Sequence, residues 1–293
     1  MVSLADSLLT VLPTDTVPPY LKRWIVGESP LSTWPAVTTA LALYLATIFG
    51  IQELMRNGSP HKLNALFRCH NAFLTVGSFL LLALIVEEVV SLYLASGFYS
   101  AICSESSWTS KLEFYYMVNY YFKYIELLDT VFLVLKKKPL SFLHVFHHSA
   151  TALLCFTQLN GKTSISWVVI SLNLFVHVIM YYYYYATAGG AKIWWKRYLT
   201  TMQIVQFVID ISIVYFGTYQ RFAHSRCTWL PHIDNCAGTE TAALFGCGLL
   251  SSYLVLFINF YVQTYRKPAS AKKAAVNKNE YQRNGVANGV KHN

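Results

Sequence analysis

Residues 143–149 read Leu-His-Val-Phe-His-His-Ser, and they lie within an apolar run that extends from 142 to 160. On a helix, His144, His147 and His148 stand at positions i, i+3 and i+4, so their imidazoles project from one face. We call these three residues the histidine triplet. Polar groups at membrane depth are expensive, and a cluster of them that faces inward indicates a functional site. The triplet therefore predicts a helix that presents three imidazoles to one pocket.

The composition indicates where this helix lies. The chain has 293 residues, of which 55% are hydrophobic and only 13% are charged, whereas soluble domains have a charged fraction of about 25%. Seven apolar runs are each near the roughly 20 residues that are needed to cross a bilayer. We therefore predict an all-α polytopic membrane protein with seven transmembrane helices. The runs are 33–55, 66–96, 113–135, 142–160, 164–187, 199–222 and 241–265.

The two ends of the chain differ from the apolar domain, which spans residues 33–265. Residues 1–32 contain four prolines, which break any long helix, so we expect a lumenal loop or interfacial segment without a removable signal peptide. Residues 266–293 are rich in Lys, Asn, Ala and Gly and lack apolar periodicity. We expect this basic cytosolic tail to be disordered.

The 23 Lys and Arg residues predict the orientation, because cytosolic segments of membrane proteins carry the excess of positive charge. Sixteen of them fall on one side of the predicted membrane, six fall on the other, and Lys123 alone lies inside. This distribution places the tail in the cytosol and the N-terminus in the lumen or outside the cell. It also explains the net charge of +9 better than nucleic-acid binding does.

The same orientation bears on the cysteines. Cys103, Cys227 and Cys236 fall on the oxidising side of the predicted membrane, where disulfides form and persist. A bridge between Cys103 and Cys236 would join two loops on that side. Three free thiols are the alternative.

Four polar groups interrupt the apolar runs, and a rise of about 1.5 Å per residue places all of them in the cytosolic half of the membrane. Unrelated structural patches would have no reason to agree in depth. Taken singly, each group except the triplet has a plain structural interpretation: a salt-bridged strut, a hydrogen-bonded core histidine, or glutamines that link helices. The groups are Lys123, Glu126 and Asp129; the histidine triplet; His177; and Gln203 with Gln206.

Two chemistries suit the triplet. The first is metal binding, because His-x-x-His-His resembles one histidine box of the membrane di-iron desaturases and hydroxylases. Apart from the triplet and His177, the histidines lie in or beside loops, so four imidazoles could hold one metal but not the larger ligand set of a di-iron pair. The second is acid–base and nucleophilic catalysis, in which a neutral imidazole attacks a thioester and forms an acyl-imidazole. The loop histidines are His61, His70, His224, His232 and His292.

The motifs that hold these polar groups resemble the ordered signature set of the ELO family of fatty acid elongases. The resemblance covers roughly residues 35–265, and residues 147–155 and 236–238 look most like the fungal and lower-eukaryote branch, which commonly has Gly where this chain has Ser149. The motifs are Lys123-x-x-Glu126-x-x-Asp129-Thr130, His144-x-x-His147-His148, His177-x-x-Met180-Tyr181-x-Tyr183-Tyr184 and Thr200-x-x-Gln203-x-x-Gln206.

The resemblance implies a seven-helix enzyme of the endoplasmic reticulum whose helices enclose a tunnel for an acyl chain. It further implies that malonyl-CoA is condensed with a long-chain acyl-CoA through an acyl-histidine intermediate, giving CO2, CoA and a 3-oxoacyl-CoA two carbons longer. No bound metal or other cofactor is implied. Candidate partners are membrane lipid, a second copy of the chain, and the ketoreductase, dehydratase and enoyl reductase of the elongation cycle.

The resemblance also implies a role for each polar residue. His147 would be the nucleophile, and His177 would polarise or deprotonate during the condensation. The other roles fall to three sets: His144 and His148 would orient this pair, Lys123, Glu126 and Asp129 would fix the charge around it, and Asn173 and Gln203 would donate hydrogen bonds to developing oxyanions.

A basic set on the predicted cytosolic face could bind the phosphates of CoA, although positive-inside topology explains each member equally well. Two alternatives to an elongase remain open at this point: a di-iron desaturase, and a seven-helix receptor or transporter. A receptor gives no reason for three histidines within five residues. The basic set is Lys136, Lys137, Lys138, Lys192, Lys196, Arg197 and Arg266.

Overall fold

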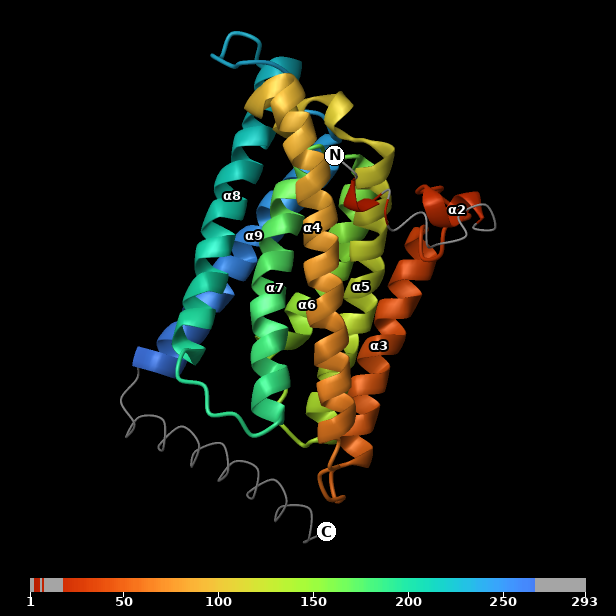
Figure 1. Ribbon diagram of the computed structural model, residues 1–293, viewed down its shortest axis with the longest axis vertical. Helices are drawn as coiled ribbons and strands as arrows, with labels where there is room; N and C mark the ends of the chain where they lie inside the picture. Colours follow the sequence, from red (N-terminus) through yellow and green to blue (C-terminus); the bar gives the residue numbers. More distant parts are fainter. Residues whose placement is uncertain (1–2, 6, 8–17, 267–293) are drawn as a thin grey trace, which may run out of the picture.

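The computed structural model describes residues 3–5, 7 and 18–266, and within these residues the fold is built from helices without strands. Seven long helices run side by side in an elongated bundle (Figure 1). The predicted all-α fold is confirmed. The long helices are α3 (Trp34–Leu54), α4 (Asn64–Cys103), α5 (Ser110–Leu135), α6 (Phe142–Gly161), α7 (Ser166–Ala188), α8 (Lys196–Arg226) and α9 (Glu240–Tyr261); the short elements are α2 (Pro19–Lys22), η2 (Glu105–Ser107) and η3 (Val262–Arg266).

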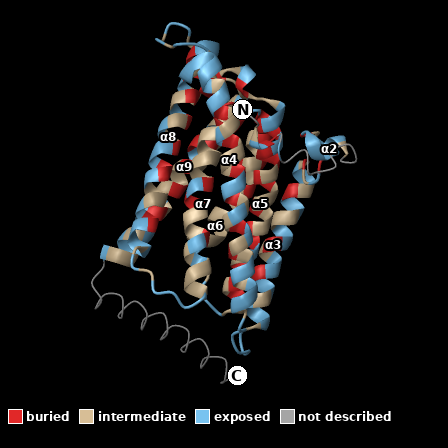
Figure 2. Cartoon of the chain, in the orientation of Figure 1, coloured by how far each residue is buried: buried red, intermediate tan, exposed pale blue. Residues whose placement is uncertain are grey.

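Five of the described helices are long and apolar enough to cross a membrane, namely α3, α4, α7, α8 and α9. Large apolar side chains are exposed on their outer faces, among them Leu43 and Phe79, and Figure 2 shows exposed segments along α3, α4 and α8. Apolar surface of this extent fits a lipid environment. Helices α5 and α6 coincide with two of the predicted runs but carry the charged residues and the histidine triplet, so their crossing of the membrane stays a prediction.

Local sequence fixes where the central helices begin and end. The hydroxyl of Thr109 accepts a hydrogen bond from the backbone N–H of Leu112 at the start of α5, and Ser141 does the same for His144 at the start of α6. Both are N-cap residues that satisfy backbone donors of the first turn. In α4, Gly97 has φ of +80° and interrupts the helical backbone, one residue beyond the predicted end of the second apolar run. Because Ser141 is the N-cap of α6, the histidine triplet begins in the first turn of that helix.

The helices form a closed ring of six with one helix outside. Neighbouring pairs in contact are α4 with α7, α7 with α8, α8 with α9, α9 with α6, α6 with α5, and α5 with α4. Helix α3 packs on α5, where the Tyr44 hydroxyl donates to Thr130 at 2.7 Å, and it lies at the edge of the bundle in Figure 1. The expectation that all seven helices enclose the interior is corrected: six enclose it, because α3 buries only one stripe of side chains.

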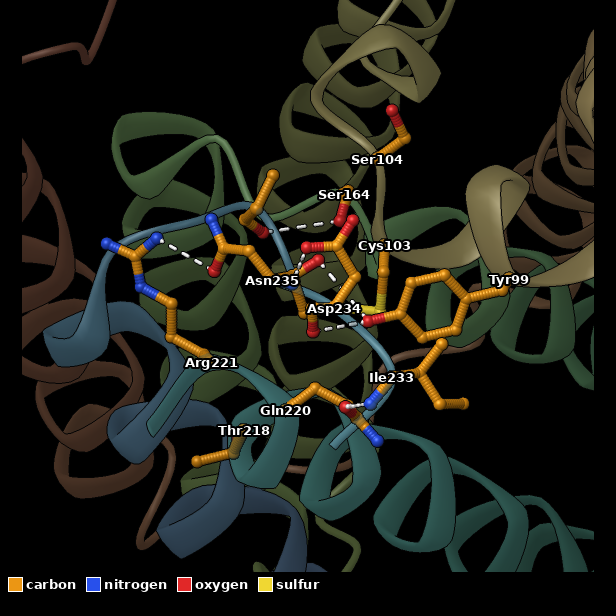
Figure 3. Close-up of a disulfide and its surroundings, with 12 residues drawn as sticks. Tyr99, Cys103, Ser104, Ser164, Thr218, Gln220, Arg221, Ile233, Asp234 and Asn235 are labelled. Carbon is orange, nitrogen blue, oxygen red and sulfur yellow. Dashed lines mark hydrogen bonds between the residues drawn. A yellow bond between two sulfur atoms is a disulfide. The ribbon is translucent and has the colours of Figure 1, made fainter. Parts of the chain in front are cut away.

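The two ends of the ring have different character. We call the end that carries the loops 55–63, 136–141 and 189–195 the basic end, and the opposite end the disulfide end. At the disulfide end, Cys103 of α4 forms a disulfide bond with Cys236, which is 133 residues away in sequence. Figure 3 shows the loop residues Asp234 and Asn235 beside Tyr99 and Cys103 of α4, with the hydroxyl of Tyr99 donating to the carbonyl of Asp234. The loop before α9 is thus fastened to the other side of the ring.

The described part of residues 1–32 also covers the disulfide end. The backbone N–H of Trp24 donates to Glu113 of α5 at 3.0 Å, and its indole N–H donates to Asn160 of α6 at 2.9 Å. The indole ring packs edge-on against Tyr120 and Phe156. This segment therefore covers the first turn of α5 and the last turn of α6. Apart from Arg266, the basic tail lies outside the described residues, so its expected disorder stays a prediction.

Replacing Cys103 with Ser is expected to lower the free energy of unfolding by about 2 to 5 kcal/mol, because the bridge closes a long loop in the unfolded chain. Thermal unfolding of the detergent-purified protein would measure this loss. Cys227→Ser is the matched control, since Cys227 lies near the same end and is a free thiol. Equal stability of Cys103→Ser and Cys227→Ser would show that the bridge contributes nothing.

Candidate active site

A buried polar circuit joins α5 to α7 near the middle of the ring. The ammonium of Lys123 donates to Oε1 of Glu126 at 2.9 Å and to Oδ1 of Asn173 at 2.8 Å. Asn173 in turn lies 3.3 Å from Nε2 of His177. Nδ1 of His177 lies 3.2 Å from the same Glu126 oxygen, although it is not aligned for a hydrogen bond. These four side chains form one connected group.

Burial explains why the group is connected. The side chains of Lys123, Glu126 and His177 are between 2% and 5% exposed, and buried charges persist only when they are paired and hydrogen-bonded. The spacing in sequence makes this possible, because Lys123 and Glu126 are three residues apart on α5 and Asn173 and His177 are four apart on α7. The group holds His177 at a fixed place on the inner face of α7.

The histidine triplet faces the same interior from α6. The rings of His144 and His148 are 4.3 Å apart, and the rings of His147 and His148 are 5.6 Å apart. His147 also packs 4.8 Å from the ring of Tyr253 and 5.6 Å from that of Phe257, both on α9. Nε2 of His144 is buried without a hydrogen-bond partner. The predicted convergence of the triplet and His177 is present in the structure.

Two cavities meet at His147. The outer cavity, toward the basic end, has about 1110 Å³ of empty volume, open solvent included, and is lined by both apolar side chains and polar ones, among them the triplet and His177. The inner cavity, toward the disulfide end, has about 790 Å³ of empty volume and a mainly apolar wall. Four residues line both, namely His147, Asn173, Gln206 and Phe207. The middle histidine of the triplet therefore stands between a cavity that holds the polar groups and one whose wall is mainly apolar.

Comparison with known sequences shows the family of this chain. The sequence model described as ELO, the GNS1/SUR4 family, matches residues 29–273. The chain belongs to the ELO family. It is 50% identical to "Putative fatty acid elongase 1" of Schizosaccharomyces pombe over 250 residues, 85% of this chain and 75% of that protein. It is 39% identical to "Fatty acid elongase A" of Dictyostelium discoideum over 253 residues, 86% and 90% of the two chains. It is 30% identical to "Very long chain fatty acid elongase 4" of Homo sapiens over 315 aligned positions, 97% and 91% of the two chains.

The third member of the charged ELO motif, Asp129, lies apart from the circuit of Lys123 and Glu126. One of its oxygens is 2.9 Å from Nε2 of His70, and the other accepts a hydrogen bond from the hydroxyl of Tyr181 at 2.9 Å. Asp129 lines the outer cavity. The ring of Tyr181 is edge-on to His177 at 5.2 Å, so Tyr181 connects Asp129 to the circuit of Lys123 and Glu126.

The position of His70 corrects a prediction. Sequence reasoning grouped His70 with the loop histidines, but it lies in the second turn of α4 and its side chain is only 7% exposed. The sequence feature that could have indicated a buried His70 was its position four residues inside the apolar run 66–96. A histidine near the end of a long helix can still turn inward, and here the carboxylate of Asp129 gives it a partner.

The two glutamines of the fourth ELO motif differ in their contacts. The amide nitrogen of Gln203 is 3.5 Å from the sulfur of Met180, and Gln203 lines the outer cavity. The amide of Gln206 donates to Asp210 at 3.0 Å. Sequence reasoning did not single out Asp210, which is fully buried on α8. Its four-residue spacing from Gln206 was the signal that could have found it.

The seven basic residues that were candidates for CoA binding all lie at the basic end, outside the walls of the outer cavity. Lys137 donates to the carbonyl groups of Arg56 and Gly58, Lys136 lies over the ring of Phe67, and Arg197 donates to Tyr261. The side chains of the other four are exposed. Among the described residues, no group of three or more His, Cys, Asp or Glu side chains is arranged to hold a metal ion.

Lys123→Met is expected to reduce the free energy of unfolding by about 3 to 5 kcal/mol, because the substitution leaves the carboxylate of Glu126 buried beside no cation. Thermal unfolding in detergent is the measurement. Lys111→Met is the control on the same helix, where the lysine is 47% exposed. Similar unfolding temperatures for the two variants would contradict the assigned pairing.

His70→Phe is expected to cost about 1 to 3 kcal/mol of stability, since it keeps the ring contact with Phe132 but removes the partner of one buried Asp129 oxygen. The exposed His61 provides the control substitution His61→Phe. Hydrogen exchange of the first turns of α4 should increase in His70→Phe alone. Unchanged exchange and stability would argue that the His70–Asp129 pair is absent in solution.

Proposed function

We propose that this chain is a fatty acid elongase that condenses malonyl-CoA with a long-chain acyl-CoA and needs no cofactor beyond these two substrates. One observation carries the proposal: the imidazole of His147 lies where a mainly apolar cavity meets a second cavity that holds the histidine triplet and opens toward the basic end. An acyl-CoA has the same division, with an apolar chain, a thioester and a polar carrier. The membership in the ELO family and its elongase relatives support this activity over that of a di-iron desaturase.

The first half of the reaction loads the enzyme. A nitrogen of the His147 imidazole attacks the thioester carbonyl, the carbon–sulfur bond breaks, and CoA leaves as the thiol after taking the proton of the imidazole. The acyl chain remains on His147 and extends into the inner cavity. His148, whose ring is 5.6 Å from that of His147, and His144 behind it orient the nucleophile.

The second half forms the new carbon–carbon bond. Malonyl-CoA loses CO2, the resulting enolate attacks the acyl carbonyl, and the carbon–nitrogen bond to His147 breaks. One proton taken up from solvent restores the neutral imidazole. His177, held by Asn173 and beside Glu126, is suited to stabilise the enolate or to move this proton. Asn173 and Gln203 line the outer cavity, where their amides can donate to the carbonyl oxygens that become negative.

The proposed topology has seven crossings, with the basic end in the cytosol and the disulfide end in the lumen of the endoplasmic reticulum. Acyl-CoA is made and used in the cytosol, so an outer cavity that opens on this side would meet its substrates directly. The exposed members of the basic set would bind the phosphates of CoA. They are Lys137, Lys138, Lys192, Lys196, Arg197 and Arg266. We extend the proposal to a homodimer and to docking of the ketoreductase, dehydratase and enoyl reductase of the cycle at this end.

Incubation of the purified protein with a long-chain acyl-CoA and no malonyl-CoA is expected to add one acyl group to the intact mass, because the first half-reaction needs only the thioester. The adduct should be absent from His147→Ala and present in His61→Ala, in which an exposed histidine is removed. Product formation without any adduct would instead favour direct condensation with the histidines as acid–base groups. Absence of both adduct and product would overturn the proposed function.

A further inference from the structure

The apolar inner cavity has three buried oxygen atoms in its wall that lack hydrogen-bond partners. They are the hydroxyl of Tyr116, Oδ1 of Asn119 and Oδ1 of Asp210. Tyr116 and Asn119 are each 2% exposed, and Asp210 is 0% exposed. Buried polar atoms without partners are rare, because each costs the desolvation of the group without a compensating bond. A plain hydrocarbon chain would leave all three in this state.

The three oxygens lie at a similar depth in the ring. Asp210 is four residues beyond Gln206 on α8, and Asn119 is four residues before Lys123 on α5. Each is therefore about 6 Å nearer the disulfide end than Gln206 or Lys123 on its own helix. Tyr116 is three residues further along α5, or about 10 Å from Lys123 along the helix axis. Two helices thus supply unpaired oxygens to one belt of the cavity wall.

The belt is held in place by bonds made on its other side. The second oxygen of Asp210 accepts from the amide of Gln206 at 3.0 Å, and the amide nitrogen of Asn119 lies 3.6 Å from the sulfur of Cys155. These contacts leave the free oxygen of each group for the cavity. The neighbouring wall is apolar, with Leu154, Ile170, Val214 and Leu250 among its residues. Such preorganised polar atoms in an apolar pocket are typical of sites that recognise one polar group of a ligand.

We infer that the inner cavity recognises an acyl chain that carries a hydroxyl group near its middle, an inference that rests on the proposed elongase function. A hydroxyl has one proton to donate and two lone pairs to accept with. It donates to the free oxygen of Asp210 and accepts from the hydroxyl of Tyr116. Ordered water offers the same O–H chemistry, so the experiment must separate the two sources.

The test compares acyl-CoA substrates of equal chain length that carry a hydroxyl at successive positions or none. The measured quantity is the ratio of kcat/KM for each hydroxyacyl-CoA to that for the unsubstituted acyl-CoA. For the wild-type protein, this ratio is expected to exceed one only when the hydroxyl is at one position of the chain or at two adjacent positions. Tyr116→Phe and Asp210→Leu should each lower this ratio roughly tenfold, since each removes one partner of the hydroxyl. Val214→Ala, which changes the apolar wall one turn beyond Asp210, should keep the positional preference.

The outcomes separate the inference from the function on which it rests. Elongation of the unsubstituted acyl-CoA with no preference for a hydroxyl at any position would overturn the inference and assign the three oxygens to ordered water. So would a preference that Tyr116→Phe leaves intact, and this variant carries the test alone if Asp210→Leu does not fold, because it removes a single oxygen. Failure of wild type to elongate any acyl-CoA would overturn the proposed function itself.

Discussion

The ion pair between Lys123 and Glu126 is the constraint on which the rest of the site depends. Removing two charges from water costs several kcal/mol per ion, and the pair recovers this only when further polar groups complete its hydrogen bonds. Asn173 of α7 accepts a hydrogen bond from Lys123, and His177 of α7 lies 3.2 Å from the Glu126 carboxylate. The rotation of α7 against α5 is therefore fixed by electrostatics, and with it the direction in which His177 faces. The triplet on α6, next to α5 in the ring, faces the same centre.

The sequence was sufficient to predict the helices and the polar layer, and the reason is geometric. The polar residues stand three or four apart within apolar runs, so each group occupies one helix face, and the rise per residue converts sequence position into depth. It could not predict which helix lies outside the ring. Helix α3 is as apolar as its neighbours, and only its packing on α5 rather than between two helices distinguishes it.

The contacts of Asp129 and Asp210 could not be predicted from the sequence, for one physical reason. Asp129 lies three residues beyond Glu126, which on a helix is a rotation of about 60°, and this places its carboxylate between His70 of α4 and Tyr181 of α7 instead of in the Lys123 circuit. Whether a polar residue turns toward one neighbour or the other depends on the rotation of the whole helix. That rotation is set by packing among all six ring members, and a single sequence does not contain it. The same holds for Asp210. The sequence predicted a role for its partner Gln206 but not the unpaired oxygen that Asp210 presents to the inner cavity.

Hydrogen bonding divides the buried polar groups of the ring into two kinds. Lys123, Glu126 and Asn173 satisfy one another, and such complete networks make a structure rigid and specific. Nε2 of His144 and the oxygen belt of the inner cavity are buried but unpaired, and they line the two chambers. Other unpaired atoms, on Asn71 and Ser78 of α4 and on Ser171 of α7, line neither chamber, so a missing partner does not by itself mark a binding site. The belt differs from these atoms because its three oxygens line one cavity, where a substrate or water can supply the partners that the protein does not.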